Sequence, residues 1–346
     1  MIDTIKLLIP VTDPDVFQKL EGTLMRFRKE NLNTGQIEFE FHTANIELGT
    51  YHRTVAVRSS SNPEGFFIEF SVPKYAKGNN VEMIHPSELP SIMDRLYVDL
   101  CEYMNHELPQ YSSWLVYKLD ACYNWILKDE SEAQHAIDFI RCIDYPKKKR
   151  HDWATSVLYQ GTAYSIKFYM KGAEFYQHDF KKVNSERAPE LQAWANRILR
   201  FEVTFRRVYL EKFFGLDTVY VANLADDWHI QEILVYFLQK VFFYINPITT
   251  TNEAVREILY TNFSRQKATR LFQFYRGFYF DDEMKAMFLR GGMNRSTIYR
   301  YKKDLKRVGI GFTLPDVQRG QSILEQLVIP SSNSQFDLVD YPFPEL

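Results

Sequence analysis

The sequence predicts an α+β fold, with an antiparallel sheet and helices in residues 1–212 and a helical part after them. Three segments in which apolar and polar residues alternate predict strands with one covered face. Longer runs with apolar residues at helical spacing, one of them ending in Gly291-Gly292, predict helices joined by a short turn. The 346 residues are 45 % hydrophobic and 16 % aromatic, which is enough for a core and excludes a disordered chain.

The predicted strands and helices of the first part follow one another along the chain. The strands are Ile2–Ile9, Ile37–His42, Thr54–Ser59, Phe66–Val72, Trp114–Trp125, the part of Ala163–Phe175 before a break at Gly172, and Ile198–Leu210. The helices are Asp13–Glu30, Ser87–His106 and Glu130–Ile143. In the second helix Ser87 can cap the start, and Pro90 falls in the first turn, where proline is tolerated.

The segment Ala163–Phe175 carries the most informative pattern, A-Y-S-I-K-F-Y-M-K-G-A-E-F. As a strand, it directs Ile166, Phe168 and Met170 to one face and Lys167, Tyr169 and Lys171 to the other. A tyrosine between two lysines, with Glu174 just past a glycine bend, favours a nucleophile for phosphate chemistry. The lysines can neutralise a phosphodiester and the carboxylate can hold a divalent metal. The alternative is the solvated face of an antiparallel strand, where lysine and tyrosine are common.

Two further strands carry ionisable groups near their middle. Lys118, Asp120, Cys122 and Asn124 share a face of Trp114–Trp125, and Arg200, Glu202, Thr204 and Arg206 share a face of Ile198–Leu210. If the three strands are neighbours, Asp120, Glu202 and Tyr169 converge on one polar patch. Two or three carboxylates with a few waters suit Mg²⁺ or Mn²⁺. Glu202 has a structural alternative, an ion pair with an arginine on its own face.

Charge is distributed unevenly along the chain. The net charge is −2, but residues 264–310 contain 12 Lys/Arg and 4 Asp/Glu, a net +8 that leaves −10 elsewhere. This asymmetry is typical of a nucleic-acid contact carried by one part of a chain. A second basic run, Pro146–Arg150, includes Lys148 and Lys149 and either touches DNA phosphates or is an ordinary solvated loop.

Residues 281–310 have the pattern helix, Gly-Gly turn, helix, which is that of a helix-turn-helix. Asn294 or Ser296 can cap the second helix. At its start Arg295, Ser296 and Thr297 would reach base edges, and further along Arg300, Lys303 and Lys306 would contact phosphates. The alternative is an ordinary basic helical hairpin.

Several features limit the class of protein. Cys101, Cys122 and Cys142 are widely spaced and odd in number, which favours a reducing compartment and disfavours a zinc cluster. No run of about 18 uncharged apolar residues occurs, and the N-terminus is not a signal peptide, so we expect a cytoplasmic protein with no membrane partner. The lack of a P-loop disfavours an ATPase or helicase.

Six blocks of the chain resemble, in order, the gene II/X replication initiators of filamentous phages, which have relatives among rolling-circle plasmid initiators. The blocks are M-I-D-T-I-K-L at the start, I-E-F-S-V-P-K-Y-A-K-G-N-N-V at 68–81, K-L-D-A near 120, F-Y-M-K-G-A-E-F at 168–175, L-R-F-E-V-T-F-R-R-V-Y-L at 199–210 and F-S-R-Q-K-A-T-R-L-F-Q-F-Y-R-G from Phe263. Together they cover nearly the whole chain. The resemblance implies a Rep-type nuclease with an antiparallel sheet.

The resemblance also implies a mechanism. Family members nick one DNA strand with a tyrosine, hold the 5′ end covalently and leave a 3′ hydroxyl for the polymerase. Carried over, Tyr169 is the nucleophile, with Asp120, Glu174 and Glu202 at the acidic positions that would bind Mg²⁺ or Mn²⁺. One departure is the turn Gly78-Asn79-Asn80, which lacks the histidine common in filamentous-phage members, so a metal or phosphate role of this turn stays open.

A histidine ligand is a further hypothesis. Many rolling-circle nucleases bind metal through His-hydrophobic-His, but none of the eight histidines here forms that triplet, so carboxylates must dominate. His178 follows Glu174 by four residues and would share its face on a helix. The alternative for His178 is a surface position beside Asp179.

We therefore expect a metal-dependent nickase and strand transferase that starts rolling-circle replication in the cytoplasm of a bacterial host. Its expected parts are a nuclease domain at 1–212, a helical connector at 213–262, a DNA-binding domain at 263–315 and an extended tail at 316–346. The expected partners are single-stranded and duplex origin DNA, with a host helicase and polymerase. A plasmid-mobilisation relaxase and a non-enzymatic DNA-binding regulator are the alternatives.

Overall fold

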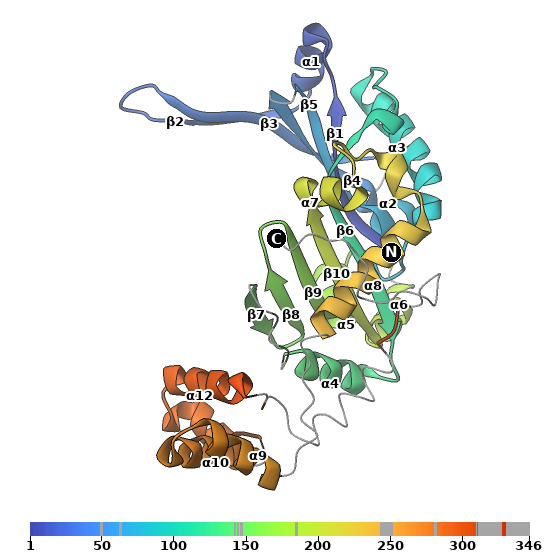
Figure 1. Ribbon diagram of the computed structural model, residues 1–346. Helices are drawn as coiled ribbons and strands as arrows, with labels where there is room; N and C mark the ends of the chain where they lie inside the picture. Colours follow the sequence, from blue (N-terminus) through green and yellow to red (C-terminus); the bar gives the residue numbers. More distant parts are fainter. Residues whose placement is uncertain are drawn as a thin grey trace. The chain divides into compact units, whose positions relative to one another are not determined.

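The computed structural model describes residues 1–48, 51–61, 64–141, 143, 145, 148–183, 186–242, 252–279, 282–308, 310 and 327–329. The chain forms two compact units (Figure 1). The first is built mainly on Met1–Ile137 and Pro146–Leu238, and the second on Asp138–Tyr145 and Gln239–Val328. Most of the expected tail at 316–346 lies outside the described residues.

The first unit is built on a 10-stranded antiparallel sheet with the strand order β2-β3-β4-β5-β1-β6-β10-β9-β8-β7. The strands are β1 Ile2–Pro10, β2 Met25–Glu30, β3 Ile37–Glu47, β4 Thr54–Ser61, β5 Glu64–Ser71, β6 Leu115–Ile126, β7 Lys149–Trp153, β8 Ser156–Gln160, β9 Tyr164–Met170 and β10 Ile198–Arg206. The sheet confirms the predicted α+β class. Since β6, β10 and β9 are adjacent, it also confirms that the three patterned strands are neighbours.

The alternation of residue types separates the two faces of the sheet. One face is apolar, and its residues Ile5, Leu119, Val203 and Ile166 on four strands are completely buried. Helices pack on this apolar face, where Phe237 contacts the rings of Phe205 and Tyr164. The opposite face carries the lysines, carboxylates and Tyr169 that the pattern had placed together. We call it the polar face.

The helices of this unit range from 6 residues in α2 to 16 residues in α3 and α8. They are α1 Pro14–Glu21, α2 Val72–Lys77, α3 Leu89–Met104, α4 Glu130–Ile140, α5 Lys171–His178, α6 Ala188–Ala195, α7 Arg207–Phe214 and α8 Asp227–Phe242. The predicted helices at Ser87–His106 and Glu130–Ile143 correspond to α3 and α4. Cys101 and Cys122 are free thiols, and Cys142 lies outside the described residues.

Three predicted elements change type partway along. The predicted helix Asp13–Glu30 is wrong beyond Glu21, because a turn at Gly22-Thr23 ends α1 and the alternating run M-R-F-R-K-E forms β2. The strand at Ile198–Leu210 ends at Arg206, where α7 begins. The strand that was expected to break at Gly172 ends at Met170, so that Lys171 already lies on α5 together with Glu174.

The second unit is helical, as predicted. It contains α9 Asn252–Asn262, α10 Arg265–Tyr279, α11 Asp282–Met287, a π-helical turn Phe288–Gly292 and α12 Arg295–Arg307. Leu259, Leu271, Phe274 and Leu305 form part of its buried core. The first predicted helix of the Gly-Gly pair does not end at Gly291, because the backbone continues through a π turn to Gly292. No helix in the described ranges is long and apolar enough to cross a membrane.

Candidate active site

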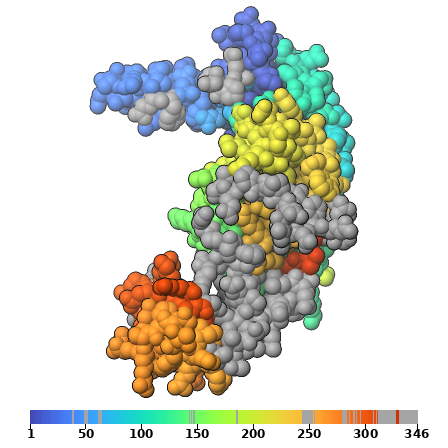
Figure 2. Space-filling model, in the orientation of Figure 1, coloured from blue at the N-terminus to red at the C-terminus, as the bar shows by residue number. Residues whose placement is uncertain are grey.

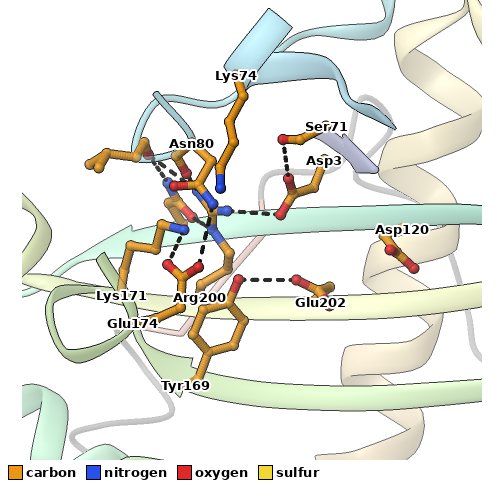
Figure 3. A network of polar contacts seen from close by, with 12 residues as sticks. Asp3, Ser71, Lys74, Asn80, Asp120, Tyr169, Lys171, Glu174, Arg200 and Glu202 are labelled. Carbon is orange, nitrogen blue, oxygen red and sulfur yellow. Dashed lines mark hydrogen bonds and ion pairs between the residues drawn. The ribbon is translucent and has the colours of Figure 1, made fainter. Parts of the chain in front are cut away.

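Tyr169 lies at the end of β9 on the polar face, opposite Arg200 of β10 (Figure 3). Its hydroxyl donates a 3.0 Å hydrogen bond to Glu202 Oε2, and the residue is only 5 % exposed. Burial, and then the charge of Glu202, raise the pKa of Tyr169 well above its usual value. The phenol is therefore protonated at neutral pH, and its hydrogen points to Glu202 Oε2.

Two lysines face the ring of Tyr169. Their Nζ atoms lie 4.3 Å (Lys167) and 5.8 Å (Lys171) from the ring centroid. Lys171 is completely buried and forms an ion pair with Glu174 one helical turn later. Burial and the charge of Arg200 lower the pKa of Lys171 to about 8. Because both Tyr169 and Lys171 are buried, they do not form the solvated strand face that was the alternative.

Glu174 is held within this cluster. Burial alone would raise the pKa of its carboxyl, but the adjacent Lys171 ammonium lowers the pKa below its usual value. Asn80 Nδ2 donates to Glu174 Oε1 at 3.4 Å. The helix can bring Glu174 here only because Gly172 is small: a Cβ at Gly172 would lie 2.2 Å from the side-chain oxygen of Asn196.

Arg200 organises the buried end of the site. Its guanidinium donates to Asp3 Oδ2 at 3.0 Å, to Asn124 Oδ1 at 2.7 Å and to the backbone oxygens of Asn80 and Val81. Ser71 Oγ donates to Asp3 at 3.3 Å and completes the network drawn in Figure 3. The network joins β1, β5, β6, β10 and the Gly78-Asn79-Asn80 turn, and it fixes the backbone beneath Tyr169.

Glu202 and Asp120 are carboxylates on adjacent strands. Burial, followed by the charges of Asp3 and Asp120, raises the pKa of Glu202 to about 7. Burial also raises the pKa of Asp120, although Lys118 Nζ lies 3.0 Å from Asp120 Oδ2 and opposes that shift. Glu202 pairs with neither arginine of its own face: the carboxylate partner of Arg200 is Asp3, and Arg206 donates to the backbone oxygen of Thr162. The alternative role predicted for Glu202 is therefore not what the structure shows.

Asp120 and Glu202 offer carboxylate oxygens, the ligands that a hard divalent cation prefers. Asp120 Oδ1 is buried and has no hydrogen-bond partner in the described part of the chain. A cation between two nearby carboxylates would stabilise their ionised forms and lower their raised pKa values. Mg²⁺ is usually held by one or two carboxylates together with waters and substrate phosphates. Asp120 and Glu202 fit such a role. Among the described residues, no three His, Cys, Asp or Glu side chains gather around one point.

The other two predicted ligands lie elsewhere. Glu174 is engaged by Lys171 and Asn80, and Asp120 is set apart from that pair in Figure 3. His178 is the last residue of α5 and is exposed, while its neighbour Asp179 pairs with Lys74 at 2.7 Å. The structure thus brings Asp120 near Glu202, but it does not assemble the four predicted ligands.

The basic segment before β9 is partly a strand. Lys149 and Arg150 pair with β8 as the first residues of β7, so the predicted loop Pro146–Arg150 is wrong at its C-terminal end; Pro146 and Lys147 lie outside the described residues. Lys149 is exposed. Lys148 is half-buried, with its Nζ 3.7 Å from the ring centroid of Tyr164.

The predicted DNA-reading residues lie on α12. Asn294 is the cap, because its Oδ1 accepts from the backbone nitrogen of Ser296 at 2.9 Å. Ser296, Arg300 and Lys303 are exposed and Thr297 is half-buried. Arg300, Lys303 and Arg307 line one surface depression with Asp304, which pairs with Lys267. The side chains of Arg295 and Lys306 lie outside the described part of the structure.

The sequence interpretation missed three residues of the buried network as site components: Asp3, Asn124 and Asn80. One signal was available, since Arg200 interrupts the apolar run I-L-R-F at the edge of a strand that is otherwise well patterned. A buried arginine requires a carboxylate partner. Which carboxylate pairs with it could not be read from the sequence, because Asp3 is 197 positions away.

The family profile for the N-terminal part of the phage gene II replication-associated protein matches residues 1–231. Among solved structures, the rolling circle replication initiator protein from Geobacillus stearothermophilus is similar at 11 % identity and a TM-score of 0.36, over 70 % of this chain and 84 % of that one. That likeness is too low to carry an argument. No curated protein sequence matches the chain.

Proposed function

The chain belongs to the gene II family of phage rolling-circle replication proteins, and on that premise we propose that it nicks one strand of origin DNA with Tyr169 as the nucleophile. The observation that carries the proposal is the hydrogen bond from the Tyr169 hydroxyl to Glu202, between two lysines on the polar face. A nucleophile, a base with a pKa of about 7 and cations for a phosphate are the groups that strand cleavage needs.

The proposed reaction is an in-line displacement at phosphorus. Tyr169 Oη attacks the scissile phosphate as Glu202 accepts the phenolic proton. The bond between phosphorus and the 3′ oxygen breaks, and that oxygen takes a proton and leaves as a 3′ hydroxyl. The 5′ end stays on Tyr169 as a phosphotyrosine, and attack by a second 3′ hydroxyl reverses the step and rejoins a strand. A host polymerase would extend the free 3′ hydroxyl behind a host helicase.

Each lysine has a separate role in this reaction. Lys167 is half-buried and covers the ring of Tyr169, so pairing of Lys167 with a phosphodiester would uncover the nucleophile. Lys171 is fixed by Glu174 and would stabilise the charge that develops on the phosphate oxygens. Burial of Tyr169 keeps water away from the phosphotyrosine, which favours strand transfer over hydrolysis.

Asp120 and Glu202 are the residues that would hold Mg²⁺ or Mn²⁺. A cation bound there would polarise the scissile phosphate. Glu202 Oε2 accepts the phenolic hydrogen, which leaves the second carboxylate oxygen for the cation. We include Glu174 and His178 only as outer candidates, because the first is paired with Lys171 and the second is exposed.

Duplex origin DNA would be recognised by α12. In a helix-turn-helix arrangement its start, with Arg295, Ser296 and Thr297, would face base edges. Further along the helix, Arg300, Lys303 and Lys306 would contact the phosphates of the duplex. On the sheet unit, Lys148 and Lys149 would contact the phosphates of single-stranded DNA. In this division residues 1–212 carry the chemistry, 213–262 connect, and 263–315 bind the duplex.

Replacing Tyr169 with phenylalanine tests the proposed nucleophile. Tyr169→Phe removes only the hydroxyl, so the fold should persist while the covalent protein–DNA adduct disappears. The measurement is a denaturing gel of an oligonucleotide that contains the nick site. Tyr164→Phe and Tyr176→Phe are matched controls and should form normal amounts of adduct. An adduct of normal yield in Tyr169→Phe would exclude this tyrosine.

A further inference from the structure

A groove lies on the sheet unit where β2 and β3 join the rest of the sheet. In Figures 1 and 2 these two strands extend beyond their neighbours as an arm. The groove has a volume of about 570 Å³, the size of a small-ligand site. It is lined by Lys6, Phe17, Glu21, Glu40, Phe41, His42, Arg58, Ser59, Ser60 and Phe67. We call it the arm groove.

Cations cover half-buried aromatic rings in the arm groove. Lys6 Nζ lies 4.8 Å from the ring centroid of Phe67, and the Arg58 guanidinium lies 4.1 Å from that of Phe41. Next to them the Phe67 ring meets Tyr117 edge-on at 4.7 Å. Of the three phenylalanines that line the groove, Phe17 is buried, whereas Phe41 and Phe67 are half-buried. The Phe41 ring also stacks on Phe27 at 5.6 Å, so the ring faces that a ligand could take are those that Arg58 and Lys6 now cover.

Two cations of the arm groove, Lys6 and Arg58, could pair with an anionic ligand. The carboxylates of the groove are already paired, Glu21 with His42 at 2.8 Å and Glu40 with Arg26 at 2.7 Å. Lys6 and Arg58 have no carboxylate within 4.0 Å among the described residues. A ligand with both anionic groups and flat aromatic rings would pair with these cations and stack on the rings they now cover.

The arm groove shares the polar face with Tyr169. Lys6 of β1 stands opposite Lys118 of β6, which stands opposite Arg206 of β10. This row crosses the sheet between the groove and the candidate active site, and Lys118 within it pairs with Glu69 and Asp120, each at 3.0 Å. Six residues along β10 separate Arg206 from Arg200, the partner of Tyr169, which is about 20 Å of extended strand. Lys6 also lies three strands away from Tyr169, so a DNA strand longer than about four nucleotides is needed to reach from Tyr169 to the groove.

We propose that the arm groove binds single-stranded DNA, as a stacking subsite for nucleotides a short distance along the strand from the nick. Phe67 and Phe41 stack on bases, and Lys6 and Arg58 pair with the phosphates between them. This inference rests on the proposed function, because that function makes DNA the ligand. It does not require Tyr169 to be the nucleophile. The groove would hold the strand in place after cleavage, when one end is no longer continuous.

The test measures binding alone, in protein that carries Tyr169→Phe, so that failure of the proposed chemistry cannot affect it. Fluorescence anisotropy follows oligo-dT of about ten and about four nucleotides, the second too short to reach from Tyr169 to the groove. The groove variants are Arg58→Gln and Phe67→Leu. Their matched controls are Arg95→Gln and Tyr103→Leu, at exposed positions of α3 outside the groove.

For the longer oligonucleotide, we expect Phe67→Leu to weaken binding at least about fivefold, the effect of one lost stacking contact. Arg58→Gln should weaken binding and reduce the salt dependence by about 0.7, the value for one phosphate contact on a single strand. The short oligonucleotide and both controls should be unaffected. Because Arg58 is exposed, its variant stays informative even if Phe67→Leu unfolds the sheet.

Three results would overturn the inference. The first is unchanged affinity of both groove variants for the longer oligonucleotide. The second is an equal loss for both lengths, which would place the effect outside the groove. The third is a protein dimer that Arg58→Gln dissociates, seen by sedimentation, since the groove would then be an interface between two copies of the chain.

Discussion

The hydrogen bond between Tyr169 and Glu202 joins two groups whose pKa values are both raised. In this state each proton stays on oxygen: Tyr169 remains a phenol, and Glu202 ionises only near pH 7. Attack on a phosphate requires the reverse, a Tyr169 oxygen without its proton. Since burial disfavours a free phenolate, transfer to ionised Glu202 during the attack is the favourable route.

The rate of nicking should therefore rise with pH as Glu202 loses its proton, through about 7 for the cation-free carboxyl and at a lower pH when a cation holds it. Below that pH Glu202 holds a proton and cannot accept another; above it Glu202 is an anion and a base. Glu202→Gln should lower the rate by about 10² or more and abolish this rise. Single-turnover nicking from about pH 5.5 to about 8.5 measures both effects. A wild-type rate that is flat with pH would contradict the role of Glu202.

Stability should respond to pH with the opposite sign. The folded state raises the pKa of Glu202, so it binds more protons than the unfolded chain between pH 4.5 and about 7, and stability falls as pH rises through that window. Glu202→Gln removes this loss. The free energy of unfolding of the variant minus that of wild type should therefore be larger at about pH 8 than at about pH 5. The increase should be at most about 3 kcal/mol. Chemical denaturation at the two pH values measures the difference.

Metal binding is a separate property of single residues. Asp120→Asn keeps the size of the side chain but removes half of the proposed carboxylate pair, so Mn²⁺ affinity should fall by about tenfold or more. Titration calorimetry with Mn²⁺ measures it without any reaction. Glu174→Gln is the control and should bind Mn²⁺ as wild type does, because Glu174 is occupied by Lys171. Equal Mn²⁺ affinity in wild type and Asp120→Asn would remove Asp120 from the site.

At the scale of elements, the buried Arg200 network holds four strands and a turn in one arrangement. Arg200→Lys keeps the charge but cannot reach Asp3, Asn124 and Asn80 together. We expect a loss of about 3 kcal/mol or more in the free energy of unfolding. Arg206→Lys, at an exposed position of the same strand, should cost well under about 1 kcal/mol in urea denaturation. Similar values for the two variants would show that the network is not needed for stability.

The sequence predicted most elements whose pattern is local. Alternation located β6, β9 and β10 and separated their two faces, because a period of two is a property of the strand itself. It did not find β2, where every side chain is exposed and no covered face produces a contrast. It also placed Lys171 on a strand, whereas the residue begins α5 and reaches Tyr169 from the helix.

The part of the candidate site that lies on adjacent strands could be predicted from the sequence. Asp120, Glu202 and Tyr169 were expected together on one face, and the register of β6, β10 and β9 places them so. The partners of Arg200 and the pairing of Glu174 with Lys171 could not be predicted. They depend on how a turn and a helix pack over the sheet, and no period in the sequence records that packing.

For the whole molecule, the uneven charge assigns different DNA contacts to different parts of the chain. Residues 264–310 carry a net +8, whereas the sheet unit places cations of β1, β4 and β9 on its polar face. We expect Arg300→Gln with Lys303→Gln to weaken binding to duplex origin DNA and reduce its salt dependence by about 2, while cleavage of a single-stranded oligonucleotide persists. Anisotropy at several salt concentrations measures this. Arg256→Gln on α9 is the control, and an equal effect from it would contradict a role specific to α12.

In the proposed reaction the cleaved strand becomes attached to Tyr169. The most direct measurement is mass spectrometry of the proteolysed protein–DNA adduct after nuclease trimming. We predict a nucleotide phosphate on the peptide that contains Tyr169, at that residue, and none on Tyr164 or Tyr176. A phosphotyrosyl nucleotide on any other residue, or nicking without a covalent adduct, would contradict the account.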